Sequence, residues 1–399
     1  MIKTTILYCG VFRFLDGNPG AHYVQGVGKA LRKLGFEAVY LGAEPEGTVK
    51  DTPETREFQY VSDPLPAHTS GQRLRRYLMG PVTGNTTLQR IKRFDPRTVA
   101  AVFTYQMHSI ALSRIQRYCA ANRIPLIANV VEWYDPTHLP WSMLFDRLDV
   151  NRRMFYMRKE LGNFIVISRL LAEFFEGTKR NVVRLPPLLD TEDPKWRLTP
   201  NLPIPYDRDA RTLVYAGAAG RKDLLANAIL GLELCNDRRF RLLVIGTSRE
   251  AVKRQMGNKA AVLDRLRDQV FFSGYLPQHH DVLSAIKACD FSVILKPDSR
   301  QAHACFPSKL PESLALGVPI IANRVSDLAE HFDDNQAGML IESADPVCFA
   351  NALSRMAALN PQHYQKMRAA ACRRAAENFD YRVKVPDLQE FLKHAGVLS

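Results

Sequence analysis

A short segment in the last third of the chain carries residues well suited to bind an anion. A buried strand is predicted at 291–295, a loop follows through Pro307, and a helix is predicted from Ser308 onward. The free N–H groups and the positive dipole end of a helix N-terminus favour an anion. Ser308 and Lys309 add a hydroxyl and an ammonium group to this place. The segment therefore predicts a site for a diphosphate.

Glu312 is the acidic residue of the same segment. It lies four residues beyond Ser308 in the predicted helix, within reach of the same ligand. A carboxylate in such a position can accept hydrogen bonds from both hydroxyls of a ribose, as acidic residues do in other Rossmann sites. We therefore expect Glu312 to bind the ribose of a nucleotide.

The block from Phe306 to Asn323 reads Phe-Pro-Ser-Lys-Leu-Pro-Glu-Ser-Leu-Ala-Leu-Gly-Val-Pro-Ile-Ile-Ala-Asn. It resembles the donor-site signature of GT-B glycosyltransferases of the retaining, nucleotide-sugar-dependent kind (glycosyl transferases group 1, family 4-like). The resemblance covers roughly residues 211–342, with a weaker echo at 164–168. It implies two facing Rossmann-like, doubly wound α/β domains with a cleft between them. It also implies these donor-binding residues: Glu312, Ser308, Lys309, Leu310, Gly217, Gly246, Leu276 and Gly20.

The chain departs from the family pattern at Ala304. Many members carry a first glutamate there, near the transferred sugar, as well as the second one that Glu312 matches. Subgroups with Pro-Ser/Thr-Lys before the helix also lack the first carboxylate, so the resemblance leaves the donor sugar open. Family members place basic residues after the first strand of the second domain, and the candidates here are Arg221 and Lys222. Together with Lys309 they would stabilise the diphosphate leaving group without a metal.

The N-terminal half supplies the candidates for the acceptor side. Gly20, after the first predicted strand, matches the position of the family's glycine loop, where a missing Cβ allows close backbone approach. His108 follows a predicted strand at 100–104, and Glu132 follows one at 126–131. Ligands of α/β folds bind at the carboxyl ends of the strands, so both residues are candidates for catalysis.

Strand and helix patterns alternate along most of the chain, which predicts parallel sheets covered on both faces. The alternation is interrupted by a Pro-rich stretch and then restarts, so the chain is expected to form two domains. The expected parts are residues 1–190, a linker at 191–210, a second domain at 211–375, and a C-terminal helix at 376–399 that could return to the first domain.

Composition limits the remaining possibilities. The chain has 399 residues, 46% hydrophobic and 24% charged, as in soluble globular proteins. Its longest apolar runs are too short to cross a bilayer, and its seven scattered cysteines favour reduced thiols. We therefore expect a cytoplasmic protein.

The formal net charge of +13 suits an anionic partner. A basic segment, Arg73–Arg76 with Arg90, Lys92 and Arg93 beyond it, could bring the enzyme to an anionic membrane surface if the acceptor is lipid-linked. A solvated helix face explains the same residues. No RNP-like, helix-turn-helix or zinc pattern points to nucleic acid.

No cofactor or metal is expected. Asp207 and Asp209 are not expected to bind a metal, because they lie in the predicted linker. His279 and His280 are not expected to do so either, because they are adjacent and one helix face cannot present both rings. The expected partners are a UDP- or GDP-sugar donor and a saccharide or lipid-linked acceptor. An inverting transferase or an epimerase stays open as an alternative, with Glu132 or His108 as base. A non-catalytic nucleotide- or nucleic-acid-binding protein is the alternative of another class.

Overall fold

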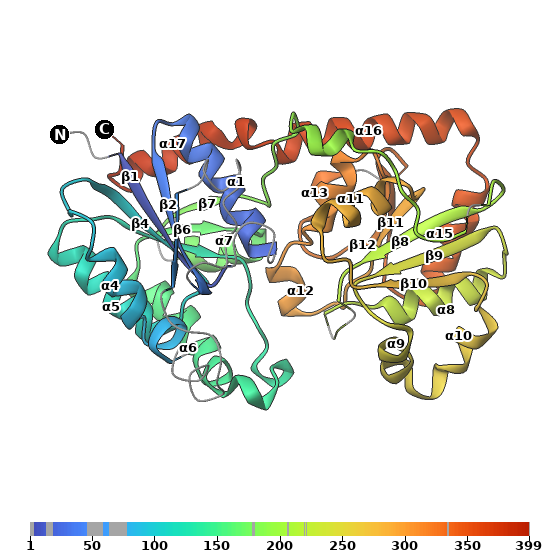
Figure 1. The fold of residues 1–399 in the computed structure, drawn as a ribbon, viewed down its shortest axis with the longest axis horizontal. Coiled ribbons are helices and arrows are strands. Elements are labelled where there is room, and N and C mark those ends of the chain that lie inside the picture. Colours follow the sequence, from blue (N-terminus) through green and yellow to red (C-terminus); the bar gives the residue numbers. More distant parts are fainter. Residues whose placement is uncertain are drawn as a thin grey trace. The chain divides into compact units, whose positions relative to one another are not determined.

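The structure of the protein is a computed structural model, drawn in Figure 1. It describes residues 4–12, 19–45, 59–63, 78–177, 180–205, 207–218, 220, 222–332 and 335–398. The chain forms two compact units. The first contains residues Met1–Leu188 and Tyr381–Ser399, and the second contains Leu189–Asp380.

The first unit is built on a seven-stranded sheet in the order β3-β2-β1-β4-β5-β6-β7, with every neighbouring pair parallel. The central strands β1 and β4 are almost wholly buried, because helices cover the sheet on both faces. The strands are β1 (Thr5–Gly10), β2 (Glu37–Pro45), β3 (Gln59–Asp63), β4 (Val99–Tyr105), β5 (Leu126–Val130), β6 (Asn163–Val166) and β7 (Asn181–Arg184).

Helices α1 and α17 lie on one face of this sheet, and α4, α5 and α6 lie on the other (Figure 1). Helix α7 follows β6, and its Phe175 ring stacks on Phe164 of that strand with centroids 4.1 Å apart. The helices of the unit are α1 (Pro19–Lys33), α4 (Asn85–Ile91), α5 (Ser109–Ala121), α6 (Leu144–Glu160), α7 (Arg169–Glu176) and α17 (Val385–His394), with short turns at η1 (Leu78–Val82), η2 (Pro136–His138), η3 (Trp141–Met143) and η6 (Tyr381–Lys384).

The second unit has a six-stranded parallel sheet in the order β10-β9-β8-β11-β12-β13. Its strands are β8 (Arg211–Ala216), β9 (Phe240–Ile245), β10 (Val270–Gly274), β11 (Phe291–Ile294), β12 (Ile320–Asn323) and β13 (Gly338–Ile341). Its helices are α8 (Leu225–Cys235), α9 (Arg249–Met256), α10 (Ala261–Arg265), α11 (His279–Lys287), α12 (Arg300–Ala304), α13 (Lys309–Ala315), α14 (Leu328–His331), α15 (Pro346–Ala357) and α16 (Pro361–Phe379), with short turns at η4 (Pro194–Arg197) and η5 (Gly257–Lys259).

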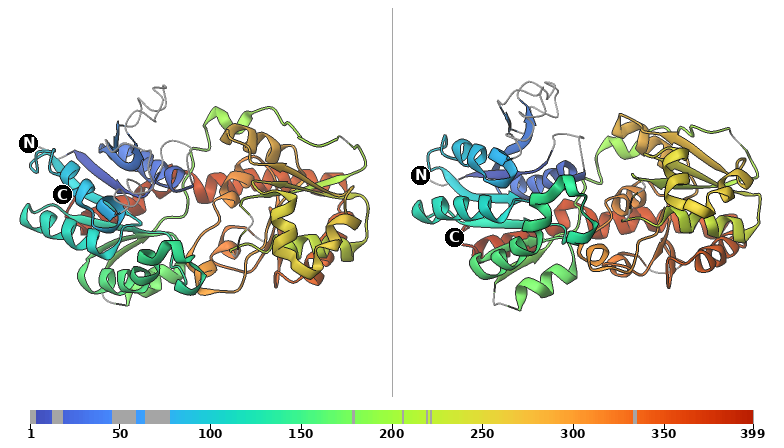
Figure 2. Two further views of the ribbon diagram at one scale, coloured as in Figure 1. Left: turned by 60° about the horizontal axis from the view of Figure 1, so that its bottom comes forward. Right: turned by 90° about the horizontal axis from the view of Figure 1, so that it is seen from below.

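Alternating side chains of the second sheet form two hydrophobic layers. Leu213 and Tyr215 of β8 point into a core shared with α8 and α15, whereas Val214 between them points into a core shared with α11. The helical layers on both sides of each sheet can be followed in the turned views of Figure 2. The residues of both hydrophobic layers of this sheet belong to the second unit.

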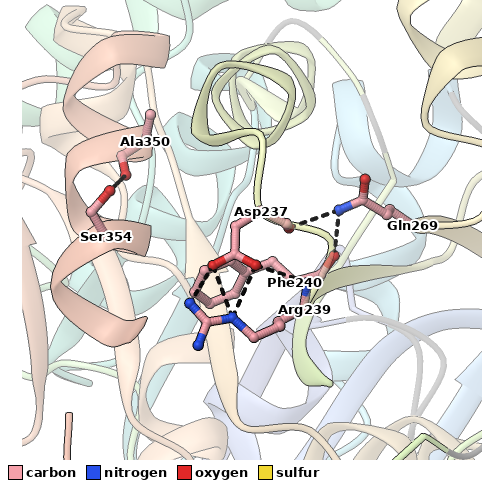
Figure 3. Close-up of polar contacts among 6 residues, drawn as sticks. All are labelled: Asp237, Arg239, Phe240, Gln269, Ala350 and Ser354. Carbon is pink, nitrogen blue, oxygen red and sulfur yellow. Dashed lines mark hydrogen bonds and ion pairs between the residues drawn. The ribbon is translucent and has the colours of Figure 1, made fainter. Parts of the chain in front are cut away.

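Side-chain hydrogen bonds hold the turn that leads into β9 (Figure 3). Arg239 donates to both carboxylate oxygens of Asp237, which lowers the pKa of that carboxyl. Gln269 donates through Nε2 to the carbonyl oxygens of Asp237 and Phe240, at 3.0 and 2.8 Å. These bonds fix where β9 begins, at the edge of the sheet opposite its carboxyl ends.

The structure corrects one expectation about the parts of the chain. The segment 191–210, predicted to be an interdomain linker, is part of the second unit. Its Trp196 and Leu198 are buried in the core on the α11 side, and Lys287 of α11 donates to the Trp196 carbonyl oxygen at 2.9 Å. The expected return of a C-terminal helix to the first domain agrees with the structure, because α17 belongs to the first unit, whereas α16 belongs to the second.

The basic segment also differs from the expectation. Arg73–Arg76 lie outside the described residues. Arg90 is not part of a basic surface, because its side chain is buried and donates to the Gly42 carbonyl oxygen at 3.0 Å.

All seven cysteines are free thiols. Among the described residues, no helix is long and apolar enough to cross a membrane.

Candidate functional site

The loop after β11 begins with a fixed turn at the carboxyl end of the second sheet. The side chain of Asn323, at the end of β12, accepts from the Lys296 backbone N–H at 2.9 Å and donates to the Lys296 carbonyl oxygen at 3.0 Å. The buried amide thus ties together the ends of two neighbouring strands. This contact fixes the direction in which the Lys296 side chain leaves the sheet.

Glu312 is the buried acid of this site. Its side chain is 5% exposed, and its Oε2 accepts from the Lys309 ammonium at 2.6 Å. Its Oε1 lies 3.3 Å from Nε2 of His279, the first residue of α11. Both oxygens therefore face nitrogen groups, and the carboxylate has a defined orientation. A buried carboxylate is stable only with such partners.

His279 is a site residue that the sequence analysis did not assign. The adjacent pair His279-His280 was considered only as a metal site, and sequence spacing gives no sign that the first ring reaches Glu312. The Lys309 ammonium and the His279 ring thus face the two oxygens of one carboxylate.

Lys296 is a second residue at this edge of the sheet that the sequence analysis did not assign. Its ammonium lies 2.5 Å from Oδ1 of Asp223, with both side chains mostly buried. Asp223 directly follows Lys222, so this ion pair brings the end of β11 next to the loop after β8. Lys222 is partly exposed, and Arg221 lies outside the described residues. The sequence signal for Lys296 is its position at the end of a predicted strand.

Glycines stand at the carboxyl ends of β8, β9 and β10. Gly217 donates to the Ile245 carbonyl oxygen, and Gly246 donates to that of Gly274. Gly246 has φ +93°, and a Cβ placed on it would lie 2.9 Å from the Gly217 carbonyl oxygen. This close approach requires glycine. Leu276, after β10, packs against the core on the α11 side.

The segment expected to be a loop contains a short helix, α12. Ser299 caps it by accepting from the Ala302 N–H. Ala304, at its last position, is fully buried, so the family's first glutamate is replaced by a packed methyl group. The adjacent His303 holds Asp298 at 2.7 Å through Nε2 and accepts from the Ser326 N–H at 3.2 Å through Nδ1.

In the first unit, Gly20 and Glu132 come near one aromatic ring. A Cβ on Gly20, in the first turn of α1, would lie 2.8 Å from the Tyr105 hydroxyl oxygen. Burial and the negative charge of Glu132 raise the pKa of Tyr105. Tyr105 ends β4 and Glu132 follows β5, so these groups lie at the carboxyl edge of the first sheet, where α/β folds bind ligands.

His108 lies in a different environment. Its side chain is buried, and its two ring nitrogens lie 3.1 Å from Asp146 and 3.4 Å from Asp149. Asp149 also accepts from the Ser109 backbone N–H and hydroxyl. The network connects the start of α5 with α6. Both ring nitrogens of His108 thus face carboxylates of α6, and its catalytic role stays a prediction.

Comparisons with known proteins agree with this geometry. Residues 210–358 match the protein-family model described as Glycosyl transferases group 1. A search of curated proteins finds no match to the chain. The family match covers the whole segment from β8 to the end of α15, which contains Lys222, Lys296, Lys309 and Glu312.

Several solved structures share the fold over nearly the full chain. A glycosyltransferase from Rickettsia africae has 15% identity and a TM-score of 0.67, with 98% of each chain covered. HepE of Anabaena, solved with UDP, has 14% identity and a TM-score of 0.67, covering 98% of this chain and all of HepE. Sucrose-phosphate synthase of Thermosynechococcus elongatus has 15% identity and a TM-score of 0.69, covering 99% of this chain and all of that one. The expected GT-B fold is confirmed.

Proposed function

We propose that the protein is a glycosyltransferase that transfers a sugar from a UDP- or GDP-sugar to a saccharide or lipid-linked acceptor. The match of residues 210–358 to the family model Glycosyl transferases group 1 and the GT-B fold support this proposal. The donor nucleotide binds to the second unit, at the carboxyl ends of β8, β9 and β11. The pathway is surface polysaccharide or glycan biosynthesis, in the cytoplasm.

The observation that carries the proposal is the buried carboxylate of Glu312 between Lys309 and His279, inside the segment that the family model matches. A ribose offers two hydroxyls to this carboxylate. A diphosphate beside it would attract the ammonium of Lys309, which can move from the carboxylate to the phosphate because the side chain is flexible and partly exposed.

Leaving-group stabilisation is assigned to fixed cations. Breaking the bond between the anomeric carbon and the phosphate oxygen leaves negative charge on the diphosphate, and preorganised positive groups lower the barrier to that step. Lys309, Lys222 and Arg221 are proposed for this role, with the Ser308 hydroxyl and the backbone at Leu310, Gly217, Gly246 and Leu276 lining the donor site. The reaction is proposed to need no metal or cofactor.

The stereochemical course is proposed to be retaining. The acceptor oxygen attacks from the face that the diphosphate leaves, and the departing phosphate takes the acceptor proton, so no protein base is required. Glu132, near Gly20 and Tyr105, is the group that would serve as a base in the alternative inverting mechanism. The anomeric configuration of the product distinguishes the two mechanisms.

The first test is thermal unfolding of the purified protein with UDP, GDP, ADP, CMP or NAD, each with and without magnesium. A ligand that binds only the native state at a hundredfold excess over its Kd stabilises it by about 2.7 kcal/mol. We expect stabilisation by UDP or GDP, independent of magnesium, and loss of that stabilisation in Glu312→Ala.

The matched control is Glu342→Ala, which removes an exposed carboxylate of the same unit whose partner is Arg324. It should leave the nucleotide response unchanged. Stabilisation by NAD alone, or by no nucleotide, would contradict the proposal. A response that requires magnesium would contradict its metal-independent part.

A further inference from the structure

A stripe of exposed apolar side chains runs along η3 and α6 in the first unit. Trp141 is 77% exposed, Leu148 70% and Phe155 56%, and Leu144 between them is 43% exposed. These four residues are here called the α6 stripe. Phe155 also meets the rings of Trp133 and Phe174, with centroids 6.4 and 6.0 Å away, so Trp141 and Leu148 are the most exposed members of the stripe. Large apolar side chains exposed together mark an interaction surface.

The spacing places the stripe on one side of the helix. Leu144, Leu148 and Phe155 of α6 are separated by four and seven positions, which repeat on one face of an α-helix. Trp141 lies in η3, directly before that helix. The opposite face supplies Val150, Met154 and Met157 to the core of the unit. Helix α6 therefore carries large apolar side chains on its exposed face as well as on its buried face.

The charges beside the stripe are positive. The Arg147 guanidinium lies 4.4 Å from the centroid of the Trp141 ring, and Arg152 is exposed on the next turns. The carboxylates of Asp146 and Asp149 face His108 on the inner side. At the end of the helix, Lys159 and Glu160 pair with each other at 3.7 Å. The exposed face of α6 thus combines apolar and aromatic groups with arginine.

We propose that the α6 stripe docks the protein on an anionic lipid bilayer. Tryptophan, leucine and phenylalanine enter the boundary between headgroups and acyl chains, and arginine pairs with anionic headgroups. The formal net charge of +13 acts in the same direction. The inference rests on the proposed function in one respect: a lipid-linked acceptor gives the enzyme a reason to be at a membrane. It moves the proposed membrane contact from the basic segment 73–93 to α6.

The test is co-sedimentation with vesicles of phosphatidylglycerol and phosphatidylethanolamine, and with vesicles of phosphatidylcholine alone. We expect binding to the anionic vesicles, weakened by salt. The double variant Trp141→Ser/Leu148→Ser should lower the partition coefficient about tenfold or more. Arg152→Gln should lower it about fivefold, on anionic vesicles only.

The control variant is Leu234→Ser, which removes a leucine on α8 of the second unit that is 58% exposed. It should bind vesicles like the unchanged protein. The inference is overturned if the unchanged protein does not bind anionic vesicles, or if the double variant binds as well as Leu234→Ser. It is also overturned if sedimentation velocity shows a dimer that only the double variant dissociates while vesicles are not bound, because the stripe then covers a second copy.

Unfolding is checked in the same samples by melting temperature. Nucleotide stabilisation is measured separately, so the two proposals fail independently. Vesicle binding that depends on the stripe, without any nucleotide response, would support the membrane surface and contradict the donor site.

Discussion

At the scale of single residues, the proposed donor site centres on one carboxylate. Glu312 is buried, and each of its oxygens faces a nitrogen group from a different part of the fold. The Lys309 ammonium can leave for a phosphate, whereas the His279 ring is mostly buried and stays in place. We infer that His279 is a positioning residue that holds Glu312 in the orientation a ribose needs.

His279→Ala is expected to lower affinity for the bound ribonucleoside diphosphate about fivefold to tenfold, because it removes one hydrogen-bonding partner of a buried carboxylate. His279→Gln should restore most of it, since the amide can donate from a similar position. Isothermal titration with the ribo- and 2′-deoxyribonucleotide measures the effect. The ratio of the two affinities should fall in His279→Ala.

Two controls separate positioning from general damage. His280→Ala removes an exposed ring on the same helix and should change neither affinity. In the Glu312→Ala background, His279→Ala should cause no further loss, since the histidine acts through that carboxylate. An additive loss in the double variant would show that His279 acts by another route.

At the scale of elements, the strand ends of the second sheet are shaped by glycine. Gly246 and Gly274 both have positive φ, at +93° and +70°, but their surroundings differ. A Cβ at Gly246 would meet the Gly217 carbonyl oxygen, whereas a Cβ at Gly274 would meet nothing within 4 Å. Glycine at the end of β9 therefore lets two loops approach each other at the proposed phosphate site.

Gly246→Ala should destabilise the protein by about 2 kcal/mol or more, from backbone strain and the contact with Gly217. Gly274→Ala carries the backbone strain alone and should cost about 1 kcal/mol. Urea unfolding of both variants gives the comparison. Equal losses of unfolding free energy in the two variants would show that the loop after β8 can move away, and that the close approach between residues 246 and 217 is not required.

At the scale of the whole molecule, the C-terminal segment of the chain returns from the second unit to the first. The parallel bridge between Leu189 and Asp380 joins the two places where the chain passes from one unit to the other. Thr191 donates to the Asp380 carboxylate from its backbone N–H at 3.0 Å and from its hydroxyl. Helix α17 then completes the first unit, where it contacts α1 and β7.

Phe391→Ala should destabilise the first unit by about 3–5 kcal/mol, because this ring of α17 is buried in its core. Hydrogen–deuterium exchange should rise in α1 and β7 while β8 and β9 remain protected, with the nucleotide response retained. The control Glu390→Ala removes an exposed neighbour on the same helix. A uniform rise in both units would show instead that they unfold as one cooperative body.

The sequence by itself determined the fold class, most strands and helices of the two sheets, and the segment that carries Glu312, Ser308 and Lys309. These features are local. A buried parallel strand is a short apolar run, and a helix start is a capping residue before a periodic pattern, so a few neighbouring residues encode each one. The weakest patterns, β3, β7 and β13, were missed because each is short and lies at or near a sheet edge.

The tertiary structure alone decided which residues meet. His279 reaches Glu312, and Lys296 reaches Asp223, across many residues of intervening chain, and no sequence spacing encodes such contacts. His108 stands at a strand end like a ligand-binding residue, yet two carboxylates of α6 surround it. The segment 191–210 has the composition of a linker, but the second unit buries Trp196 within it. Contacts between distant segments depend on how the elements pack, and packing is a property of the folded chain.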